Sequence, residues 1–271
     1  MTNHKWNLKF WRLPQLDNLE LLHASGLTHE YPAHIHEAHS IGIILHGTET
    51  AFCRGTSHKG HLGNLVLINA EEVHSSLSTN SEYRLIKVRP AMLDRIARDL
   101  GSPACGREPF PNVVVKDPLV SRAVLRLHLK LEQDISALEH ESDFVSTISL
   151  LLTRQHSSYR APQTKAKREE GYVKLVRDYL KSNYAENVSL SQLTSLTNLS
   201  PYYLLRVFHS STGFPPHEYQ TQVRIAQARK LIRSGASLSE TALETGFFDQ
   251  SHLSRNFKRI VGVTPRQYFH S

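Results

Sequence analysis

Residues 189–219 read SLSQLTSLTNLSPYYLLRVFHSSTGFPPHEY, and residues 237–268 read SLSETALETGFFDQSHLSRNFKRIVGVTPRQY. Both segments open on Ser-Leu-Ser, continue through Leu-x-Arg-x-Phe and close on Gly-x-x-Pro-x-x-Tyr, so one pattern occurs twice. The copies are offset by 48 residues at the start and by 49 residues afterwards. The extra residue falls in a turn, which leaves the expected helices intact. Two copies are too few for a solenoid, so each copy must form a unit with its own function.

Each copy carries the signals of two short helices joined by a tight turn. At the start of each copy a serine precedes a Gln or Glu by three residues, which is the capping-box pattern that opens a helix. Asn198 and Gly246 follow, and both residue types tolerate the left-handed backbone of a tight turn. A Leu and a Phe four residues apart mark the buried face of the next helix. This pattern predicts helix-turn-helix units at about 189–210 and 237–260.

The second helix of such a unit presents its outer, N-terminal residues to the major groove of DNA. Arginine can form two hydrogen bonds to guanine, glutamine can do the same to adenine, and serine can bond to either. For any one side chain a solvated helix face is the alternative, but its occurrence in two aligned copies favours DNA contact. The candidate DNA-binding residues are Tyr202, Tyr203, Arg206, His209, Gln250, Ser251, Ser254, Arg255, Lys258 and Arg259.

An uninterrupted stretch between the copies, from Pro216 to Arg233, predicts one connecting helix. A helix of about 18 residues spans roughly 27 Å. Successive major-groove segments on one face of DNA lie about 34 Å apart. The connecting helix can therefore set two reading units about one turn of DNA apart.

The charge of the chain is unevenly distributed. Residues 1–159 carry 16 Lys and Arg against 17 Asp and Glu, whereas residues 160–271 carry 16 against 8. The whole basic excess therefore lies in the half that contains the repeat. A basic domain beside a near-neutral one favours a polyanionic partner, with nucleic acid ahead of a membrane surface. A merely soluble surface is the alternative.

Cysteine and apolar residues indicate the compartment. The only cysteines are Cys53 and Cys105, which provide neither a disulfide framework nor a cysteine zinc site. No apolar run approaches the roughly 18 residues of a membrane span, and the start of the chain lacks the apolar core of a signal peptide. We expect a soluble, cytoplasmic protein that makes no membrane contact.

The amino-terminal part predicts an antiparallel sandwich or barrel. Short apolar runs at 40–45, 64–69 and 83–88 are separated by Gly, Asn, Ser and Thr, as in small all-β domains. Nine of the 17 histidines fall between His23 and His74, a density that suggests a site.

The order of these histidines resembles the cupin pattern, a small jelly-roll barrel. In cupins two closely spaced histidines and a later one bind a metal, together with a carboxylate. His34, His36 and His74 stand at the histidine positions, but Ser40 replaces the carboxylate. Residues at i and i+2 of a strand share a face, so His34 and His36 are expected to point into the barrel. Three readings stay open: a divalent metal site, an organic effector pocket, and ordinary half-buried histidines.

Two amphipathic stretches and a polar segment follow the expected barrel. Apolar residues at spacings of three and four run from Val120 to Leu138 and again from Phe144 to Leu152, and Asp117-Pro118 opens the first helix. These helices can pack on the barrel or form a dimer. The predicted division is a sensing domain at 1–116, a helical segment at 117–156, a linker at 157–170 and a DNA-binding domain at 171–271.

From about residue 172 to 271 the chain resembles the AraC/XylS family of bacterial transcriptional regulators, most specifically in its second copy. The amino-terminal half is similar to that family's cupin-type sensing domain. The resemblance implies sequence-specific binding of double-stranded DNA, control by a small-molecule effector in the barrel, a homodimer and RNA polymerase as a further partner. It also implies a nucleoid-associated protein in the bacterial cytoplasm. Leu205 stands where family members often carry a polar reader, so the first unit is expected to read fewer bases.

No adjacent nucleophile and base stand out in the sequence, so we expect no enzyme activity. The alternatives are a metal-dependent cupin enzyme joined to a DNA-binding domain and a metal-responsive regulator.

Overall fold

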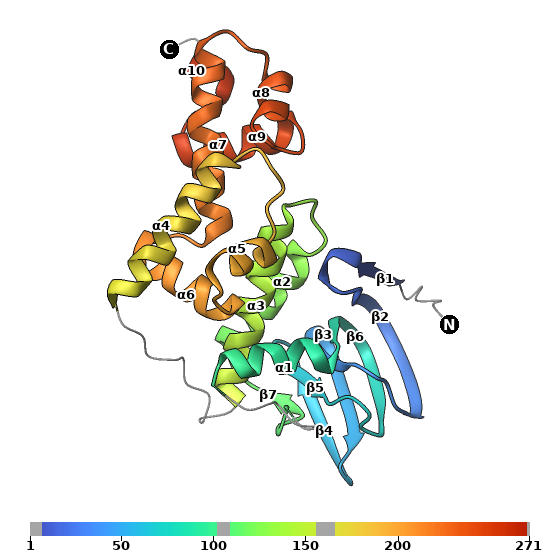
Figure 1. The fold of residues 1–271 in the computed structure, drawn as a ribbon. Helices are drawn as coiled ribbons and strands as arrows, with labels where there is room; N and C mark the ends of the chain where they lie inside the picture. The colour runs from blue at the N-terminus through green and yellow to red at the C-terminus, as the bar shows by residue number, and fades with distance from the viewer. Residues whose placement is uncertain (1–6, 102–108, 156–165, 270–271) are drawn as a thin grey trace. The chain divides into compact units, whose positions relative to one another are not determined.

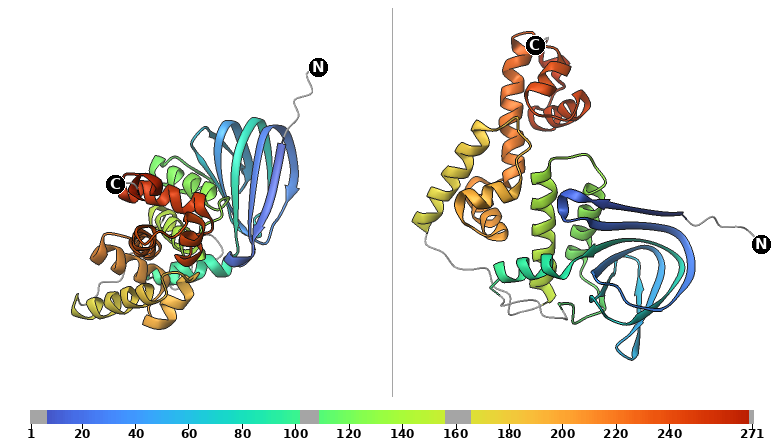
Figure 2. Two further views of the ribbon diagram at one scale, coloured as in Figure 1. Left: turned by 90° about the horizontal axis from the view of Figure 1, so that it is seen from above. Right: turned by 45° about the vertical axis from the view of Figure 1, so that its right-hand side comes forward.

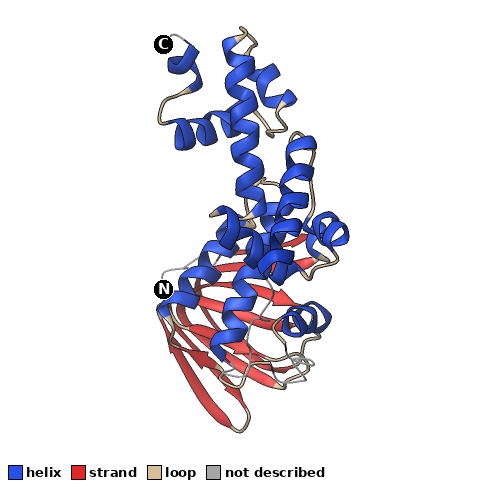
Figure 3. Ribbon diagram, turned by 60° about the vertical axis from the view of Figure 1, so that its left-hand side comes forward, coloured by secondary structure: helices blue, strands red, loops and turns tan. Residues whose placement is uncertain are grey.

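The computed structural model describes residues 7–101, 109–155 and 166–269 (Figure 1). The chain forms two compact units. The first comprises residues 1–133 and 144–162, and the second comprises residues 134–143 and 163–271. No helix in the described part of the chain is both long and apolar enough to cross a membrane. Figure 3 shows strands in the first unit only, whereas the second unit is helical.

The first unit is built on one seven-stranded antiparallel sheet. The strand order is β1-β2-β6-β3-β5-β7, with β4 paired to β3, and the sheet curls strongly (Figure 2). Shifts of register in β2 and β3 indicate β-bulges, which bend strands and increase their twist. The strands are β1 (Asn7–Leu13), β2 (Leu19–His34), β3 (His39–Cys53), β4 (Thr56–His61), β5 (Leu65–Ile68), β6 (His74–Val88) and β7 (Val114–Val115).

The apolar runs of the sequence mark only parts of these strands. The run at 40–45 is the first half of β3, and the run at 83–88 is the end of β6. The remaining halves contain mainly polar residues, such as His, Thr, Ser and Glu, so no apolar run marks them, yet β3 pairs with β6 along both halves. The prediction of an antiparallel sheet domain is confirmed, but its strands are longer than the apolar pattern indicates.

Three helices belong wholly or partly to the first unit: α1 (Pro90–Asp99), α2 (Pro118–Lys130) and part of α3 (Ala137–Gln155). Asp117 caps α2 by accepting hydrogen bonds from the backbone N–H groups of Leu119 and Val120, as the Asp-Pro signal predicts. The first apolar stripe was expected to continue to Leu138. Instead α2 ends at Lys130, and Leu138 lies in the first turn of α3.

The buried face of α2 is fixed to the sheet by a polar contact. His128 is fully buried, its Nδ1 accepts a hydrogen bond from Arg84 at 3.0 Å, and its Nε2–H donates to the carbonyl of Leu22 at 3.1 Å. Arg84 also pairs with Glu132 of the following turn. Every polar atom of this imidazole therefore has a partner, which buried polar groups require.

The second unit consists of helices. They are α4 (Ala166–Ser182), α5 (Leu190–Thr197), α6 (Pro201–Thr212), α7 (Pro216–Arg233), α8 (Leu238–Glu244), α9 (Gln250–Val261) and α10 (Pro265–Phe269). The predicted linker at 157–170 lies outside the described residues up to 165. Its last five residues are the first residues of α4, where Ala, Lys, Arg and Glu are good helix formers.

The two copies of the repeat adopt the same local structure. Both capping boxes form, and Asn198 and Gly246 both have left-handed backbones, with φ of 53° and 74°. An edge-on aromatic pair closes each copy, Phe208 with Tyr219 at 5.6 Å and its counterpart Phe257 with Tyr268 at 5.4 Å between ring centroids. Equivalent residues therefore make equivalent contacts, and the prediction of two helix-turn-helix units is confirmed.

Candidate functional site

The outer face of α9 is polar, basic and open. Gln250, Ser251, Arg255 and Lys258 are exposed and Ser254 is half-buried, while Leu253 and Phe257 on the opposite side are fully buried. Positions 251, 254, 255 and 258 lie three and four residues apart, so they share one face of the helix. This face presents two cations and several hydrogen-bonding groups to solvent, which suits the edges of bases and the phosphates beside them.

The position of α9 is set by an apolar core that its buried face shares with its neighbours. This core contains Ile225, Ala228, Ile232, Ala242, Phe247, Leu253 and Phe257. It joins α9 to α7 and α8, so the reading face is held by rigid helices rather than by a loop. Asp249 caps α9 by accepting a hydrogen bond from the N–H of His252 at 2.6 Å.

The corresponding face of α6 is narrower than the sequence predicts. Tyr203 is only 8% exposed, and its hydroxyl donates a hydrogen bond to Glu169 of α4 at 2.6 Å. The prediction that Tyr203 faces outward is wrong because α4 packs against this side of α6. Leu205 is buried as well, and Tyr202 and Arg206 are half-buried. The helix-turn-helix unit that contains α6 therefore offers fewer groups to DNA than the one that contains α9.

The basic residues near the ends of α6 and α9 differ in their surroundings. His209 and Lys258 are exposed. Arg259 donates hydrogen bonds to Glu218 of α7 at 2.9 Å and to Asn256 at 3.2 Å, so it holds α9 to the connecting helix. Arg259 therefore already has a structural contact, whereas Lys258 is the freer candidate for a phosphate.

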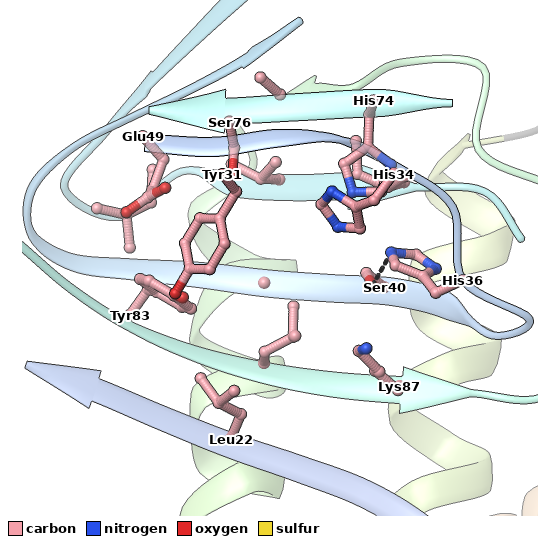
Figure 4. A pocket seen from close by; sticks show the side chains of 16 residues that line it. Leu22, Tyr31, His34, His36, Ser40, Glu49, His74, Ser76, Tyr83 and Lys87 are labelled. Carbon is pink, nitrogen blue, oxygen red and sulfur yellow. Dashed lines mark hydrogen bonds between the residues drawn. The ribbon is translucent and has the colours of Figure 1, made fainter. Parts of the chain in front are cut away.

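The first unit encloses a cavity of about 200 Å³ inside the curled sheet (Figure 4). Its lining is mostly apolar, with polar groups gathered toward two ends. The polar and ionisable residues that line it are Tyr31, His34, His36, Ser40, Glu49, His74, Ser76, Tyr83 and Lys87. Figure 4 shows the three histidines and Lys87 at one end and Glu49, Tyr31 and Tyr83 at the other.

The structure brings the three predicted histidines together. The centroids of the His34 and His74 rings are 4.3 Å apart, and those of His36 and His74 are 4.8 Å apart. One ring nitrogen of each lies within 4.8 Å of the others. The prediction that His34 and His36 share a face of one strand is wrong. Strand β2 ends at His34, and His36 lies in the loop before β3.

Hydrogen bonds to the backbone fix how these three rings are protonated. The Nδ1 atoms of His34, His36 and His74 lie 2.8, 2.6 and 2.9 Å from the carbonyl oxygens of residues 32, 38 and 72. A carbonyl only accepts, so each Nδ1 carries a hydrogen, and in the neutral ring the Nε2 is the atom with the lone pair. The Nε2 of His36 accepts from the hydroxyl of Ser40 at 3.0 Å. Ser40 therefore supports a histidine instead of supplying a carboxylate.

Burial and charge keep two of these rings neutral. Burial, together with the neighbouring Lys87 ammonium, lowers the pKa of His36 to about 4. The pKa of His74 is also lowered, chiefly by burial. At neutral pH both rings therefore present neutral nitrogen lone pairs to the cavity.

Sequence reasoning missed Lys87, Glu49, Tyr31 and Tyr83. The signal for two of them is the alternation along the end of β6, because Tyr83, Leu85 and Lys87 all line the cavity while the residues between them do not. Residues at i and i+2 of a strand share a face. Glu49 follows bulges in β3 that shift this alternation, so its position does not follow from spacing.

Comparisons with known proteins agree with both halves of the structure. The family described as "AraC-like ligand binding domain" matches residues 18–147, and a "Helix-turn-helix domain" matches residues 193–271. The uncharacterized HTH-type transcriptional regulator YbfI of Bacillus subtilis is 32% identical over 251 residues, covering 89% of this chain and 89% of that protein. The HTH-type transcriptional activator RhaS of Escherichia coli K12 is 26% identical over 264 residues, covering 94% of this chain and 88% of RhaS.

Among solved structures, an apo form of ToxT from Vibrio cholerae is 14% identical, with a TM-score of 0.40 over 99% of this chain and 98% of ToxT. The sequence identity with YbfI along nearly the whole length of both proteins, together with the two matched domains, carries the assignment. The chain belongs to the AraC family of DNA-binding HTH-type transcriptional regulators, with an amino-terminal ligand-binding domain.

Proposed function

We propose that this regulator reads two successive major-groove segments of its operator, with α9 as the main reader and α6 as the lesser one. The observation that supports this most is the open face of α9, where Gln250, Ser251 and Arg255 stand together above a rigid apolar core. In α6 only Tyr202 and Arg206 remain near the corresponding positions, and both are half-buried. Base discrimination should therefore be stronger in the half of the operator that α9 contacts.

The connecting helix supports the spacing of the two readers. Helix α7 has 18 residues, Pro216–Arg233, and is continuous. At 1.5 Å per residue it is about 27 Å long, close to the roughly 34 Å between successive turns of the major groove. Because residues 160–271, which contain both helix-turn-helix units, carry the basic excess of the chain, DNA binding should weaken steeply with salt as counterions are released.

Control of this reading is assigned to the first unit. The proposed sensing domain is residues 1–116, and the proposed DNA-binding domain is residues 171–271. A small molecule in the cavity of the sheet would change DNA binding through the helical segment and the 157–170 linker that join these domains. The apolar residues of α2 and α3, such as Val124, Leu127 and Ile148, are already buried within one chain, so the homodimer that we propose must use other surfaces. We assign the cytoplasmic nucleoid as the place of action. RNA polymerase is the proposed partner for the transcriptional outcome.

Arg255→Ala should separate base reading from phosphate binding. On a duplex selected from a random pool we expect about a 5- to 150-fold loss of affinity, the size of one bidentate base contact. On a random duplex the loss should be much smaller. Fluorescence anisotropy with both duplexes at matched salt measures the difference.

The matched control is Lys258→Ala on the same helix. It should weaken both duplexes equally and reduce the salt slope by about one, as loss of a phosphate contact does. Equal losses on both duplexes for Arg255→Ala would show that Arg255 holds only phosphate. The proposed reading face would then be incorrect.

A metal-responsive regulator is the second candidate, and the histidine geometry favours it. One ring nitrogen of each histidine lies within 4.8 Å of the others, and each Nδ1–H is held by a backbone carbonyl, which is how metal-binding histidines are usually oriented. Metal binding at the Nε2 of His36 would displace the hydrogen bond from Ser40. Two nitrogens of a tetrahedral zinc site, each about 2.1 Å from the ion, are about 3.4 Å apart, so the widest pair of the cluster would have to close by about 1.4 Å. A metal ion here would contribute a positive charge and an open coordination position toward the cavity.

Cobalt binding tests this candidate. Addition of Co²⁺ to EDTA-dialysed protein should give visible absorption bands at one equivalent, and His74→Gln should remove most of this absorption. His61→Gln, at an exposed position of β4, is the control and should leave the spectrum unchanged. A cobalt spectrum that is the same in His74→Gln and in the wild type would exclude these histidines as the site.

A further inference from the structure

The cavity contains a cation that no described residue neutralises. Lys87 is half-buried at the histidine end, and within residues 7–101 and 109–155 it forms no hydrogen bond or ion pair. Glu20 is its cross-strand neighbour on β2, but Arg12 holds the Glu20 carboxylate with hydrogen bonds of 3.0 and 2.7 Å. A partly desolvated ammonium without a counter-ion is costly. A negative group at this point would remove that cost.

The other acid of the cavity does not fill this role. Figure 4 places Glu49 at the opposite end from Lys87, beside Tyr31 and Tyr83. Its Oε2 accepts a hydrogen bond from Ser78 at 2.9 Å. Burial raises the pKa of Glu49, so its negative charge is disfavoured where it lies. Glu49 therefore does not pair with the Lys87 ammonium.

At the same end of the cavity as Lys87 lie two hydrogen-bond acceptors without donors in the described part of the chain. The Nδ1–H groups of His34 and His74 are bound to backbone carbonyls, so their Nε2 atoms can only accept. In the described part of the chain neither Nε2 has a hydrogen-bond donor. The Nε2 of His36 differs, because the Ser40 hydroxyl already donates to it. A complementary ligand group must therefore combine a negative charge with a neighbouring O–H donor.

The rest of the cavity limits the size and charge of the ligand. The walls between the polar ends are formed by apolar side chains, among them Leu22, Ile44 and Leu85. The volume of about 200 Å³ is below the roughly 300–1,000 Å³ of pockets for drug-sized ligands. One lysine in an apolar cavity suits a single negative charge, whereas a phosphate dianion would need more donors.

A second, polar cavity of about 820 Å³ adjoins the first, and His36 and Lys87 line both. Charges of both signs line the outer cavity: Arg12 is paired with Glu20, Arg89 is paired with Asp17, and Glu37 also lines it. A charged group at Lys87 would thus lie where the two cavities meet, with an apolar body enclosed on the inner side.

We propose that the inner cavity binds a small α-hydroxy carboxylate, with its carboxylate on Lys87 and its hydroxyl donating to Nε2 of His34 or His74. The apolar body of the ligand lies against Leu22, Ile44 and Leu85. This assignment rests on the proposed function, in which a molecule in this cavity controls the DNA-binding unit. It names the chemical class of that molecule.

A matched set of six-carbon probes tests the proposal on the EDTA-dialysed full-length protein. α-Hydroxyhexanoate carries both groups, hexanoate carries only the carboxylate, and the vicinal hexanediol carries only hydroxyls. By isothermal titration calorimetry α-hydroxyhexanoate should bind most tightly. Lys87→Met should weaken both carboxylates about tenfold or more, because a charge-assisted hydrogen bond is lost, and should barely affect the diol.

Three further variants make the result decisive. Lys87→Arg keeps a positive charge and should therefore retain part of the affinity for the two carboxylates. Such a result would show that the loss in Lys87→Met comes from the missing charge and not from misfolding. His74→Leu should reduce the advantage of α-hydroxyhexanoate over hexanoate. Lys59→Met, at an exposed position of β4, should change nothing. The proposal is overturned if none of the three probes binds, if the diol binds as tightly as the acids, or if Lys87→Met leaves the acids unaffected.

Anisotropy on the selected duplex, with and without the acid, keeps the two assignments separate. Acid binding that depends on Lys87 but leaves DNA affinity unchanged would support the ligand class and contradict control from the cavity. Specific DNA binding without any acid binding would support the reading face and contradict the ligand class.

Discussion

Gly246→Ala is expected to lower the free energy of unfolding of the second unit by about 2–5 kcal/mol and to abolish specific DNA binding. Gly246 lies in the turn between α8 and α9 with φ of +74°, a conformation that costs a residue with a side chain about 1–2 kcal/mol. A Cβ there would also lie 2.1 Å from the carbonyl oxygen of Ala185. That atom belongs to the backbone, so the turn itself must move, and overpacking of this kind adds about 1–3 kcal/mol.

Two other glycines separate the cost of the left-handed backbone from the cost of the steric clash with Ala185. Gly213 and Gly262 also have left-handed backbones, with φ of 76° and 90°, but a Cβ at either one would meet nothing within 4 Å. Gly213→Ala and Gly262→Ala should therefore show the conformational cost alone. Urea unfolding followed by circular dichroism, with anisotropy on the selected duplex, measures all three. If Gly246→Ala is no worse than the two controls, the close approach to Ala185 does not exist in solution.

The repeat shows how much local sequence signals can predict. Capping serines, an Asn or Gly in each turn and Leu-Phe pairs four apart specify each helix from its own residues, so α5, α6, α8 and α9 begin and end close to where the sequence places them. The orientation of a side chain is different when a third element decides it. Tyr203 lies beside α4, which begins about 35 residues earlier in the chain, and no periodicity within α6 reports that contact.

The cavity was less predictable than the repeat for a related reason. The histidine spacing pointed to the right residues, but His36 reaches the cluster from a loop, and only strand pairing places Lys87 beside it. Strand pairing joins residues far apart in sequence, and bulges in β2 and β3 break the simple alternation. Side chains that occur at ordinary strand positions, such as Tyr83 and Lys87, therefore become recognisable as lining residues only in the folded sheet.

Acid should destabilise the first unit between about pH 6.5 and pH 4. Burial lowers the pKa of His39 to about 4, and burial together with the Arg84 guanidinium lowers the pKa of His128 to about 4. Both are almost fully buried, at 2% and 0% exposed, and both use Nδ1 as an acceptor, His39 from the N–H of Ala70 and His128 from Arg84. Protonation would replace an acceptor with a donor in each case.

The sign of the effect follows from proton binding in the two states. Between pH 6.5 and 4 the unfolded chain binds protons at these histidines and the folded chain does not, so stability falls as the pH falls through this window. Each histidine contributes on the order of 3 kcal/mol at the acid end. Asp94 near His39, and Glu132 near His128, favour the protonated forms and oppose this loss. The dependence of the free energy of unfolding on pH therefore measures whether the effect of burial on the two histidine pKa values exceeds the opposing effect of these carboxylates.

Both tryptophans of the chain, Trp6 and Trp11, belong to the first unit, so urea unfolding followed by tryptophan fluorescence reports on that unit selectively. In the wild type the free energy of unfolding should decrease steadily from pH 6.5 to 4. His128→Gln keeps a donor for the Leu22 carbonyl but cannot be protonated. We expect it to be less stable at neutral pH, and we expect its free energy of unfolding to depend on pH less steeply, by the amount that corresponds to about one bound proton. His61→Gln should leave the slope unchanged. A wild-type stability that rises as the pH falls would mean that Glu132 stabilises a protonated His128, and that Arg84 no longer donates to Nδ1 of this ring.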